Sequence, residues 1–326
     1  MSDDNCPALS VVVPVFNEEE SLKTLYSRIC QSLEGRHSYE LIFIDDGSTD
    51  ASFSVLEGIC SEDSRVSVIR LRRNFGQTAA LSAGFKYSRG AIIVPLDADG
   101  QNDPADICKL IDKLNEGYDI VSGWRRKRHD NLTRTIPSRM ANWIIAKITG
   151  VKLHDFGCTL KAYRADSIKE IKLYGEMHRF IPALASWSGE KIAEMEVNHH
   201  PRQAGVAKYG LGRTFKVVLD LITIKFLASF STKPIYVFGG LGVISGAGAF
   251  LSGLAVLYQK FISSAHLSMN RNPFLMLTVL LVITSVQFIL MGLLAEILVR
   301  TYHESQDREI YVVQQVIGNN SDTAQL

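Results

Sequence analysis

The stretch LSVVVPVFNEEESLKTLYSRICQSLEGRHSYELIFIDD, residues 9–46, decides the fold of this chain. Two short apolar runs rich in β-branched residues, LSVVVPVF and YELIFID, flank a segment whose apolar residues recur every three to four positions. The two runs predict buried strands, and the segment between them predicts an amphipathic helix. A strand, a helix and a second strand in this order are typical of a parallel β-α-β unit.

The same alternation continues to residue 99. A polar-led helical pattern begins at Thr49 and is followed by the runs RVSVIRLR, TAALSAGFKYS and AIIVPLD. We therefore expect an α/β domain with a mainly parallel sheet covered by helices, in which ligands bind beyond the carboxyl ends of the strands. No Gly-x-Gly-x-x-Gly motif follows the first strand, which removes the main support for a dinucleotide-binding domain.

Two carboxylates one residue apart follow the fourth predicted strand, in the sequence DADGQ at residues 97–101. An isolated Asp-x-Asp pair is most often a solvated turn. This pair follows a buried strand, and Pro104 can begin a helix just beyond it. Carboxylate oxygens suit a hard divalent cation that also holds phosphate oxygens. The pattern predicts Mg²⁺ or Mn²⁺ bound by Asp97, Asp99 and Gln101.

The second predicted strand ends in DDGSTD, residues 45–50. Gly47 is expected to turn the chain, and Ser48 or Thr49 to cap the next helix. A functional role can coexist with this structural one, because a carboxylate at a strand end can accept hydrogen bonds from a ribose or a base.

Two charge-free apolar stretches, Pro234 to Tyr258 and Phe274 to Ala295, are each long enough to cross a hydrocarbon core of about 30 Å. Two buried core helices are the alternative, but their length, pairing and lack of charge favour membrane spans. Small residues at helical spacing in the first stretch favour a packed hairpin and also self-association. Lys and Arg are more frequent on the outer flanks than in the connection, so we expect both termini in the cytoplasm.

Composition excludes some classes of protein. The net charge is +1, so no global basic field indicates a nucleic-acid partner. The five cysteines are scattered, without Cys-x-x-Cys spacing, and indicate neither a disulfide framework nor a zinc site. Between Leu211 and Ser231, apolar residues recur at helical spacing among basic ones, which favours an interfacial helix on anionic headgroups over a helix packed only on the N-terminal domain.

Five motifs, PVFNEEESL, IDDGSTD, LRRNFGQ, LDADGQNDP and GCTLKAYR, occur in this order before the two spans. Together they resemble the family 2 glycosyltransferases, specifically the polyisoprenyl-phosphate glycosyltransferases related to dolichyl-phosphate mannose synthase and the bacterial bactoprenol glucosyltransferases. The resemblance covers roughly Leu9 to Gly210 and implies a Rossmann-like GT-A fold, a nucleotide-sugar donor and an inverting transfer onto a lipid phosphate. We find no Gln-x-x-Arg-Trp motif of the processive synthases, so we expect one sugar per turnover.

The resemblance also implies donor-site roles for individual residues. The resemblance implies that four residues near the ends of the first two strands form the nucleoside pocket. It implies that the motif at residues 97–101 forms the metal and diphosphate site. It also implies a loop that closes over the donor diphosphate, for which an ordinary Gly-rich connection is the alternative. The expected nucleotide-sugar-binding residues are Pro14, Phe16, Glu18, Asp46, Asp97, Arg202 and Lys208.

A basic loop, GWRRKR at residues 123–128, follows the strand-like run YDIVS. A solvated loop is the default interpretation, but guanidinium groups bind phosphate oxygens bidentately, as an anionic acceptor requires. The resemblance implies that Arg125, Arg134 and Ser138 hold the lipid phosphate.

The segment HDFGC, residues 154–158, resembles the place where inverting members of the superfamily carry a base. A phosphate monoester has a second pKa of about 6 and is largely anionic at neutral pH, so proton removal is not the hard step. Asp155 is expected either to act as a base or to position arginines or the sugar. The expected catalytic residues are Asp155, Asp99 and Arg125.

We divide the chain into a catalytic domain (1–210), a juxtamembrane amphipathic helix (211–233), two transmembrane helices within 234–300 (about 234–258 and 274–297) and a cytoplasmic tail (301–326). The expected reaction moves one hexose, glucose from UDP-glucose, onto undecaprenyl or a similar polyprenyl phosphate at the cytoplasmic face of the inner membrane. Expected partners are the nucleotide sugar, the polyprenyl phosphate, membrane lipids and further copies of the chain. The alternatives are GDP-mannose or another UDP-sugar as donor, or a non-catalytic lipid-flipping or assembly subunit.

Overall fold

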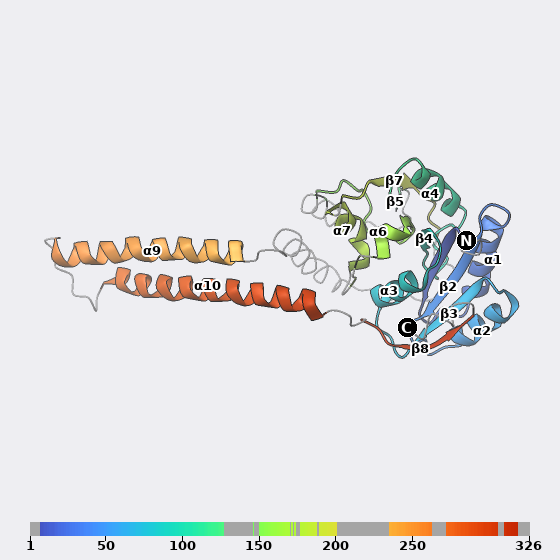
Figure 1. Cartoon of the computed structure of the whole chain (residues 1–326), viewed down its shortest axis with the longest axis horizontal. Helices are drawn as coiled ribbons and strands as arrows, with labels where there is room; N and C mark the ends of the chain where they lie inside the picture. Colours follow the sequence, from blue (N-terminus) through green and yellow to red (C-terminus); the bar gives the residue numbers. More distant parts are fainter. Residues whose placement is uncertain are drawn as a thin grey trace. The chain divides into compact units, whose positions relative to one another are not determined.

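A computed structural model of the chain describes residues 7–126, 146, 150–169, 171, 173, 177–187, 189–200, 235–262, 272–305 and 310–318. The chain divides into two compact units. The first consists of Met1–Thr223 together with Glu309–Leu326, and the second of Ile224–Arg308. Figure 1 shows a layered α/β body for the first unit and a pair of long helices for the second.

The first unit begins with the predicted alternation of strands and helices. In chain order the elements are β1 (Leu9–Val15), α1 (Leu22–Leu33), β2 (Tyr39–Asp45), α2 (Ser52–Glu62), β3 (Val66–Leu71), α3 (Gln77–Tyr87), β4 (Ile92–Pro95), α4 (Asp106–Asn115) and β5 (Ile120–Trp124). Shorter elements follow: β6 (Lys161–Arg164), α6 (Ala165–Lys169), the 3₁₀ helix η1 (Met177–Arg179), α7 (Ile181–Trp187) and β7 (Ile192–Glu196). The α/β class expected from the sequence is confirmed.

The strands form one mainly parallel sheet in the order β7-β5-β6-β4-β1-β2-β3, with one further strand beyond β3. Strands β1, β2, β3 and β4 pair in parallel, whereas β6 runs antiparallel to both β4 and β5. All seven residues of β2 are buried, as expected for a strand covered by helices on both faces. The carboxyl ends of β1 to β4 therefore meet at one edge of the sheet.

Two helices show how the sequence pattern produces the packing. Helix α1 buries Leu22, Leu25, Ile29 and Leu33, which recur on one helical face. Helix α3 lies directly on the sheet, and Gly84 makes this approach possible. A Cβ atom added at Gly84 would lie 2.2 Å from Cγ1 of Val12 and 2.8 Å from Cδ1 of Ile44.

The strand beyond β3 is β8 (Val313–Ile317), which the sequence analysis did not anticipate. Those residues were expected to belong to a cytoplasmic tail, but they pair antiparallel with β3, for example Val68 with Ile317. The run YVVQQVI at residues 311–317 is rich in β-branched residues, a strand signal that we missed in the sequence. Its partner β3 lies far away in the chain, so the pairing itself could not be predicted from the local pattern. The chain thus returns to the first unit after the two long helices.

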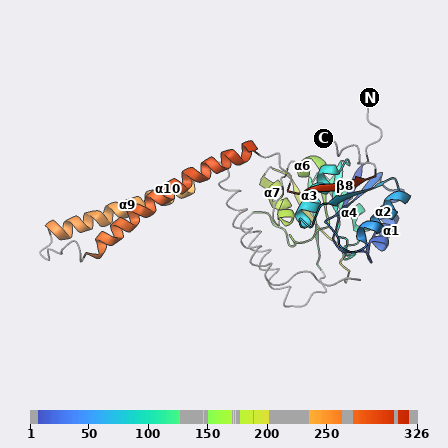
Figure 2. The ribbon, with the colours of Figure 1, turned by 90° about the horizontal axis from the view of Figure 1, so that it is seen from below.

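The second unit contains α9 (Ile235–Phe261) and α10 (Pro273–Ser305). Both are long and apolar enough to cross a membrane, over Phe238–Phe261 and Pro273–Ala295, close to the predicted spans. They pack side by side as a hairpin (Figures 1 and 2). The juxtamembrane helix predicted for residues 211–233 lies outside the described residues.

The small residues of α9 pack the hairpin together. Oγ of Ser285 donates a 2.7 Å hydrogen bond to the carbonyl oxygen of Gly242, and a Cβ at Gly242 would lie 2.8 Å from Cγ1 of Ile289. A Cβ at Gly246 would lie 3.2 Å from Oγ of Ser285. Two of the small residues that we took as favouring self-association therefore face α10 of the same chain. Self-association remains a prediction, now with less support.

The turn at Gly47 provides a test of the packing between the loops that follow β2 and β3. Gly47 has a φ of +68°, and an added Cβ would lie 2.5 Å from the backbone carbonyl carbon of Arg73. We expect Gly47→Ala to lower the free energy of unfolding by about 2 kcal/mol or more, through both strain and overlap. Thermal unfolding of the full chain in detergent measures this change.

The matched control is Gly58→Ala in the exposed part of α2, where an added Cβ meets no atom within 4 Å. Because alanine favours a helix over glycine, the control should raise the stability by about 0.5–1 kcal/mol. Equal melting temperatures for the two variants would contradict the described packing of Gly47 on the loop after β3.

Candidate active site

The loops that follow β1 and β2 are tied together by hydrogen bonds. Oγ of Ser48 accepts from the backbone N–H of Asn17 at 3.0 Å, and the Asn17 side chain accepts from the backbone N–H of Thr49 at 2.8 Å. Oγ of Ser52 accepts from the backbone N–H of Glu18 at 2.9 Å. These contacts bring Phe16 and Glu18, the predicted nucleoside-pocket residues after β1, beside the loop that carries Asp46.

The expected helix cap is wrong. Helix α2 begins after Ala51, and the first N–H groups donate to other side chains, that of Ala51 to Glu19 at 2.7 Å and that of Ser52 to Asp50 at 3.0 Å, so neither Ser48 nor Thr49 caps it. The Ser48 hydroxyl binds the neighbouring loop instead, because a loop N–H with no partner in its own segment competes for the same oxygen.

Asp46 joins the loop after β2 to the loop after β3. Its Oδ1 accepts from the N–H of Phe75 at 2.8 Å and its Oδ2 from the N–H of Gly76 at 2.9 Å. Burial raises the pKa of Asp46 to about 6, against the lowering effect of these two N–H groups. Pro14 lies in β1, one register position before the end of the strand.

Asp97 and Asp99 follow β4 at the same edge. Nε2 of Gln77 donates a 2.8 Å hydrogen bond to Oδ1 of Asp97, and Oδ1 of Asp99 accepts from the N–H of Gln101 at 3.1 Å. Burial raises the pKa of Asp97, and the charge of Asp99 raises it further. A hydrogen bond from the Thr159 side chain has the opposite effect.

This donor set fits a divalent cation. Two half-buried carboxylates that repel each other are stabilised by a shared positive charge, and the oxygens are hard ligands. Gln77 and Thr159 are contacts that we missed in the sequence. Gln77 stands in the quoted motif LRRNFGQ, but only the fold shows that it reaches the carboxylate after β4.

Arg125 and Asp155, thirty residues apart, form a close ion pair. Nε of Arg125 lies 2.8 Å from Oδ2 of Asp155 and Nη2 lies 3.1 Å from Oδ1. Oδ1 also accepts from the N–H of Gly157 at 3.1 Å. The Asp155 side chain is 2% exposed, and Glu194 of β7 accepts from its backbone N–H at 3.1 Å. The structure therefore brings together two of the three predicted catalytic residues.

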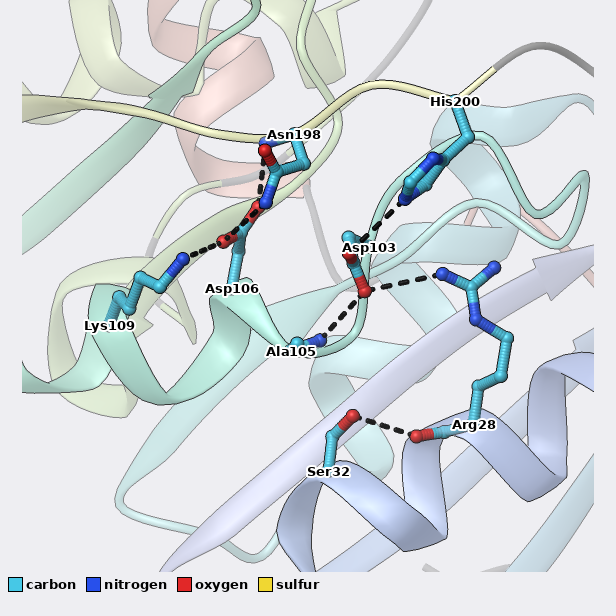
Figure 3. A network of polar contacts seen from close by, with 8 residues as sticks. All are labelled: Arg28, Ser32, Asp103, Ala105, Asp106, Lys109, Asn198 and His200. Carbon is cyan, nitrogen blue, oxygen red and sulfur yellow. Dashed lines mark hydrogen bonds and ion pairs between the residues drawn. The ribbon is translucent and has the colours of Figure 1, made fainter.

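A polar network fastens the segment after β7 to the start of α4 (Figure 3). Asp103 binds Arg28 at 3.2 Å and His200 at 3.2 Å, while Asp106 accepts from the N–H of Asn198 at 2.6 Å. The N–H of His200 donates to the carbonyl oxygen of Gln101 at 2.8 Å. The chain just before Arg202 is thus held beside the predicted metal motif.

Four predicted site residues lie outside the described residues: Arg134, Ser138, Arg202 and Lys208. Most of the others lie at the carboxyl edge of the sheet. Arg125 directly follows β5, and Asp155 lies in the segment 154–158. Their assigned roles in binding and catalysis remain predictions.

Comparison with known proteins identifies the family. Residues 10–172 match the family described as Glycosyl transferase family 2. The chain is 44% identical over 319 residues to a dodecaprenyl-phosphate galacturonate synthase of Rhizobium johnstonii, covering 96% of this chain and 94% of that protein. It is 37% identical over 318 residues to an undecaprenyl-phosphate 4-deoxy-4-formamido-L-arabinose transferase of Shewanella sediminis, covering 97% and 94%.

The fold also resembles a solved structure, the glucosyl-3-phosphoglycerate synthase of Mycobacterium tuberculosis. The TM-score is 0.52 at 20% identity, over 67% of this chain and 80% of that one. This likeness supports the GT-A fold that the motifs predicted. The chain belongs to glycosyl transferase family 2 and, within it, to the polyprenyl-phosphate glycosyltransferases, which transfer a sugar from a nucleotide sugar to polyprenyl phosphate.

Proposed function

We propose that this enzyme transfers a single galacturonosyl group from UDP-galacturonate to undecaprenyl or a similar polyprenyl phosphate. The observation that carries this proposal is the 44% identity, over nearly the whole chain, to a protein named as a galacturonate synthase. Neither of the two polyprenyl-phosphate enzymes compared above has glucose in its name, so galacturonate replaces the glucose expected from the sequence. We propose a uridine diphosphate donor, as expected from the sequence.

The acceptor phosphate supplies its own nucleophile. Its oxygen attacks the anomeric carbon as the bond from that carbon to the donor diphosphate breaks, and the configuration inverts. Because a phosphate monoester is largely ionised at neutral pH, no protein base is required. The Asp155 carboxylate already accepts from Arg125 and Gly157, so we assign it the positioning role rather than the role of a base.

Arg125 is suited to hold the acceptor phosphate. Two of its guanidinium nitrogens, Nε and Nη2, bind Asp155, which orients the planar group. The remaining N–H groups, including both on Nη1, can meet phosphate oxygens, and the side chain is 19% exposed.

Asp97, Asp99 and Gln101 would hold Mg²⁺ or Mn²⁺, which when bound stabilises the charge that develops on the leaving diphosphate. A structure of the Mycobacterium tuberculosis relative is described as a complex with Mn²⁺ and UDP-glucose. In this chain, Gln77 and Thr159 orient the Asp97 carboxylate, and the turn at Gly100 lets Asp99 bind the N–H of Gln101.

The hairpin would anchor the enzyme at the cytoplasmic face of the inner membrane, where the lipid phosphate lies. Outward-facing apolar side chains such as Val243, Phe250 and Met276 suit a lipid environment. Strand β8 follows the second span and joins the same sheet as the strands that precede the first. Both ends of the hairpin must then lie on one side of the membrane, which supports the expected topology.

The proposed function is tested with the full-length protein in detergent, undecaprenyl phosphate, a divalent cation and separate nucleotide sugars. The panel contains UDP-galacturonate, UDP-glucose, UDP-galactose and GDP-mannose, and mass spectrometry identifies the lipid product. We expect a product carrying one uronosyl group, with UDP-galacturonate as the preferred donor. A higher catalytic efficiency with UDP-glucose would restore the original expectation and overturn this proposal.

A second prediction concerns the metal carboxylate Asp99. We expect Asp99→Asn to remain folded and membrane-bound but to reduce transfer at least a hundredfold, a barrier rise of about 2.7 kcal/mol, because the leaving diphosphate loses charge stabilisation. Steady-state transfer rates over a range of Mg²⁺ and Mn²⁺ concentrations measure the effect. The control is Asp112→Asn on the exposed face of α4. Near-normal rates for Asp99→Asn at saturating metal would remove Asp99 from the site.

A third prediction concerns Arg125. Arg125→Lys keeps the charge next to buried Asp155 but loses the planar, two-pronged donor, so the KM for the lipid phosphate should rise by about tenfold, or 1.4 kcal/mol. Donor affinity, measured by calorimetry, should stay within about twofold, because the donor and acceptor phosphates bind different groups. The matched control is Arg126→Lys, whose exposed side chain binds Glu196. A collapse of donor affinity instead would assign Arg125 to the donor diphosphate.

A further inference from the structure

A narrow cavity lies next to Thr159, the hydrogen-bond partner of Asp97, and two cationic side chains, Lys161 and Arg179, form part of its lining. Among the residues that line it are Thr159, Lys161, His178 and Arg179, and Leu81 and Phe85 form part of an apolar wall. Its interior has room for a group about the size of a water molecule, which is too small for a sugar ring. Two residues of the lining belong to the site described above: Thr159, which orients Asp97, and Gly157, which donates its N–H to Asp155.

Lys161 is the buried cation in the lining of this cavity. The residue is 2% exposed, and its ammonium donates to the carbonyl oxygens of Phe156, at 3.3 Å, and Cys158. Within the described part of the chain, no carboxylate lies within ion-pair distance of Lys161, and no third acceptor takes its remaining N–H. An ammonium buried in this way costs several kcal/mol unless an anion or further acceptors compensate it.

No neighbouring group among the described residues forms an ion pair with Lys161, although the charges of Asp155 and Asp97 act on it. Arg125 and Asp155 pair with each other, so their charges largely cancel. Arg179 lines the same cavity, and its charge, like that of Arg125, opposes protonation of Lys161. Burial is the main reason that the pKa of Lys161 is lowered. Nδ1 of His178 shares a 2.7 Å hydrogen bond with Oγ1 of Thr78, which fixes the imidazole ring in the wall.

The roles proposed above for Asp97 and Arg125 would bring the donor sugar next to this cavity. Thr159 lines it and hydrogen-bonds to Asp97, which belongs to the diphosphate side of the reaction. Gly157 lines it too and donates its N–H to Asp155, which pairs with the acceptor-side Arg125. The sugar is transferred between these two sides, so a substituent on its ring can reach the cavity.

We propose that Lys161 and Arg179 bind the C6 carboxylate of the hexuronosyl group and make the enzyme select a uronate over the corresponding neutral hexose. The proposal rests on the proposed function, since it supplies the recognition of galacturonate. A carboxylate matches the charge of the cavity lining, one of its oxygens has the size that the interior admits, and it offers acceptors to a buried ammonium. A neutral hydroxymethyl group would leave the cation uncompensated. A site whose buried polar groups pair only with the correct substrate strongly rejects an analogue that leaves them unpaired.

UDP-galacturonate and UDP-galactose differ only at C6, so they form the test pair. We expect Lys161→Met and Arg179→Gln each to lower the ratio of kcat/KM for UDP-galacturonate to that for UDP-galactose by at least tenfold. The rate with UDP-galactose should stay constant or rise. Calorimetry without lipid should show the same loss of preference in donor affinity. The control is Lys169→Met on the exposed side of α6, which should leave the ratio unchanged.

The outcomes separate the two proposals. If the wild-type enzyme prefers a neutral sugar, the proposed function fails. If the wild-type enzyme prefers UDP-galacturonate and both variants keep that preference, or lose activity with both donors equally, only the carboxylate site is overturned. Should Lys161→Met fail to fold, Arg179→Gln, whose side chain is less buried, decides by the same ratio.

Discussion

The site depends on one constraint, which is that polar groups buried at the carboxyl edge of the sheet need hydrogen-bond partners. The four parallel strands β1 to β4 end together, and each ends in a loop with backbone N–H groups that have no partner in a helix or a strand. The partners come from neighbouring loops. Ser48 accepts a hydrogen bond from the loop after β1, and Asp46 accepts two from the loop after β3. Gln77 donates one to the carboxylate of Asp97 after β4. The residues predicted to bind the donor are therefore held as one connected group.

Charge organises the other half of the site. Asp97 and Asp99 form a negative pair that suits a divalent cation, and Arg125 is held in place by Asp155. Lys161 is near enough to Asp97, Asp155 and Arg125 for their charges to affect one another, and it is buried and without an ion-pair partner among the described residues. A nucleotide sugar and a lipid phosphate both bring negative charge to this region. The positive groups can balance negative substrates, while the negative pair suits a divalent cation.

Different interactions hold the two helices of the hairpin together. Burial of apolar surface cannot hold two helices together in lipid, so close packing and short hydrogen bonds do so. Gly242 and Gly246 allow α10 to approach, and Ser285 bonds to the backbone of α9. The apolar side chains on the outer surface are left for the lipid. The membrane anchor is thus recognisable from length and composition, but its packing depends on single small residues.

Alternating strands and helices, two apolar spans and the carboxylate motif after β4 were all predictable from the sequence, because local patterns of hydrophobicity determine them. The motifs were also sufficient to indicate the family. The tertiary structure alone decided the contacts between segments that are distant in the chain: Gln77 with Asp97, Arg125 with Asp155, and β8 with β3. It also decided that Ser48 binds across to the next loop rather than capping α2, and that Lys161 is buried beside a cavity. The physical reason is that the contacts of a residue depend on which strand ends lie next to each other in the sheet. Hydrophobic periodicity along the chain does not determine the order of the strands.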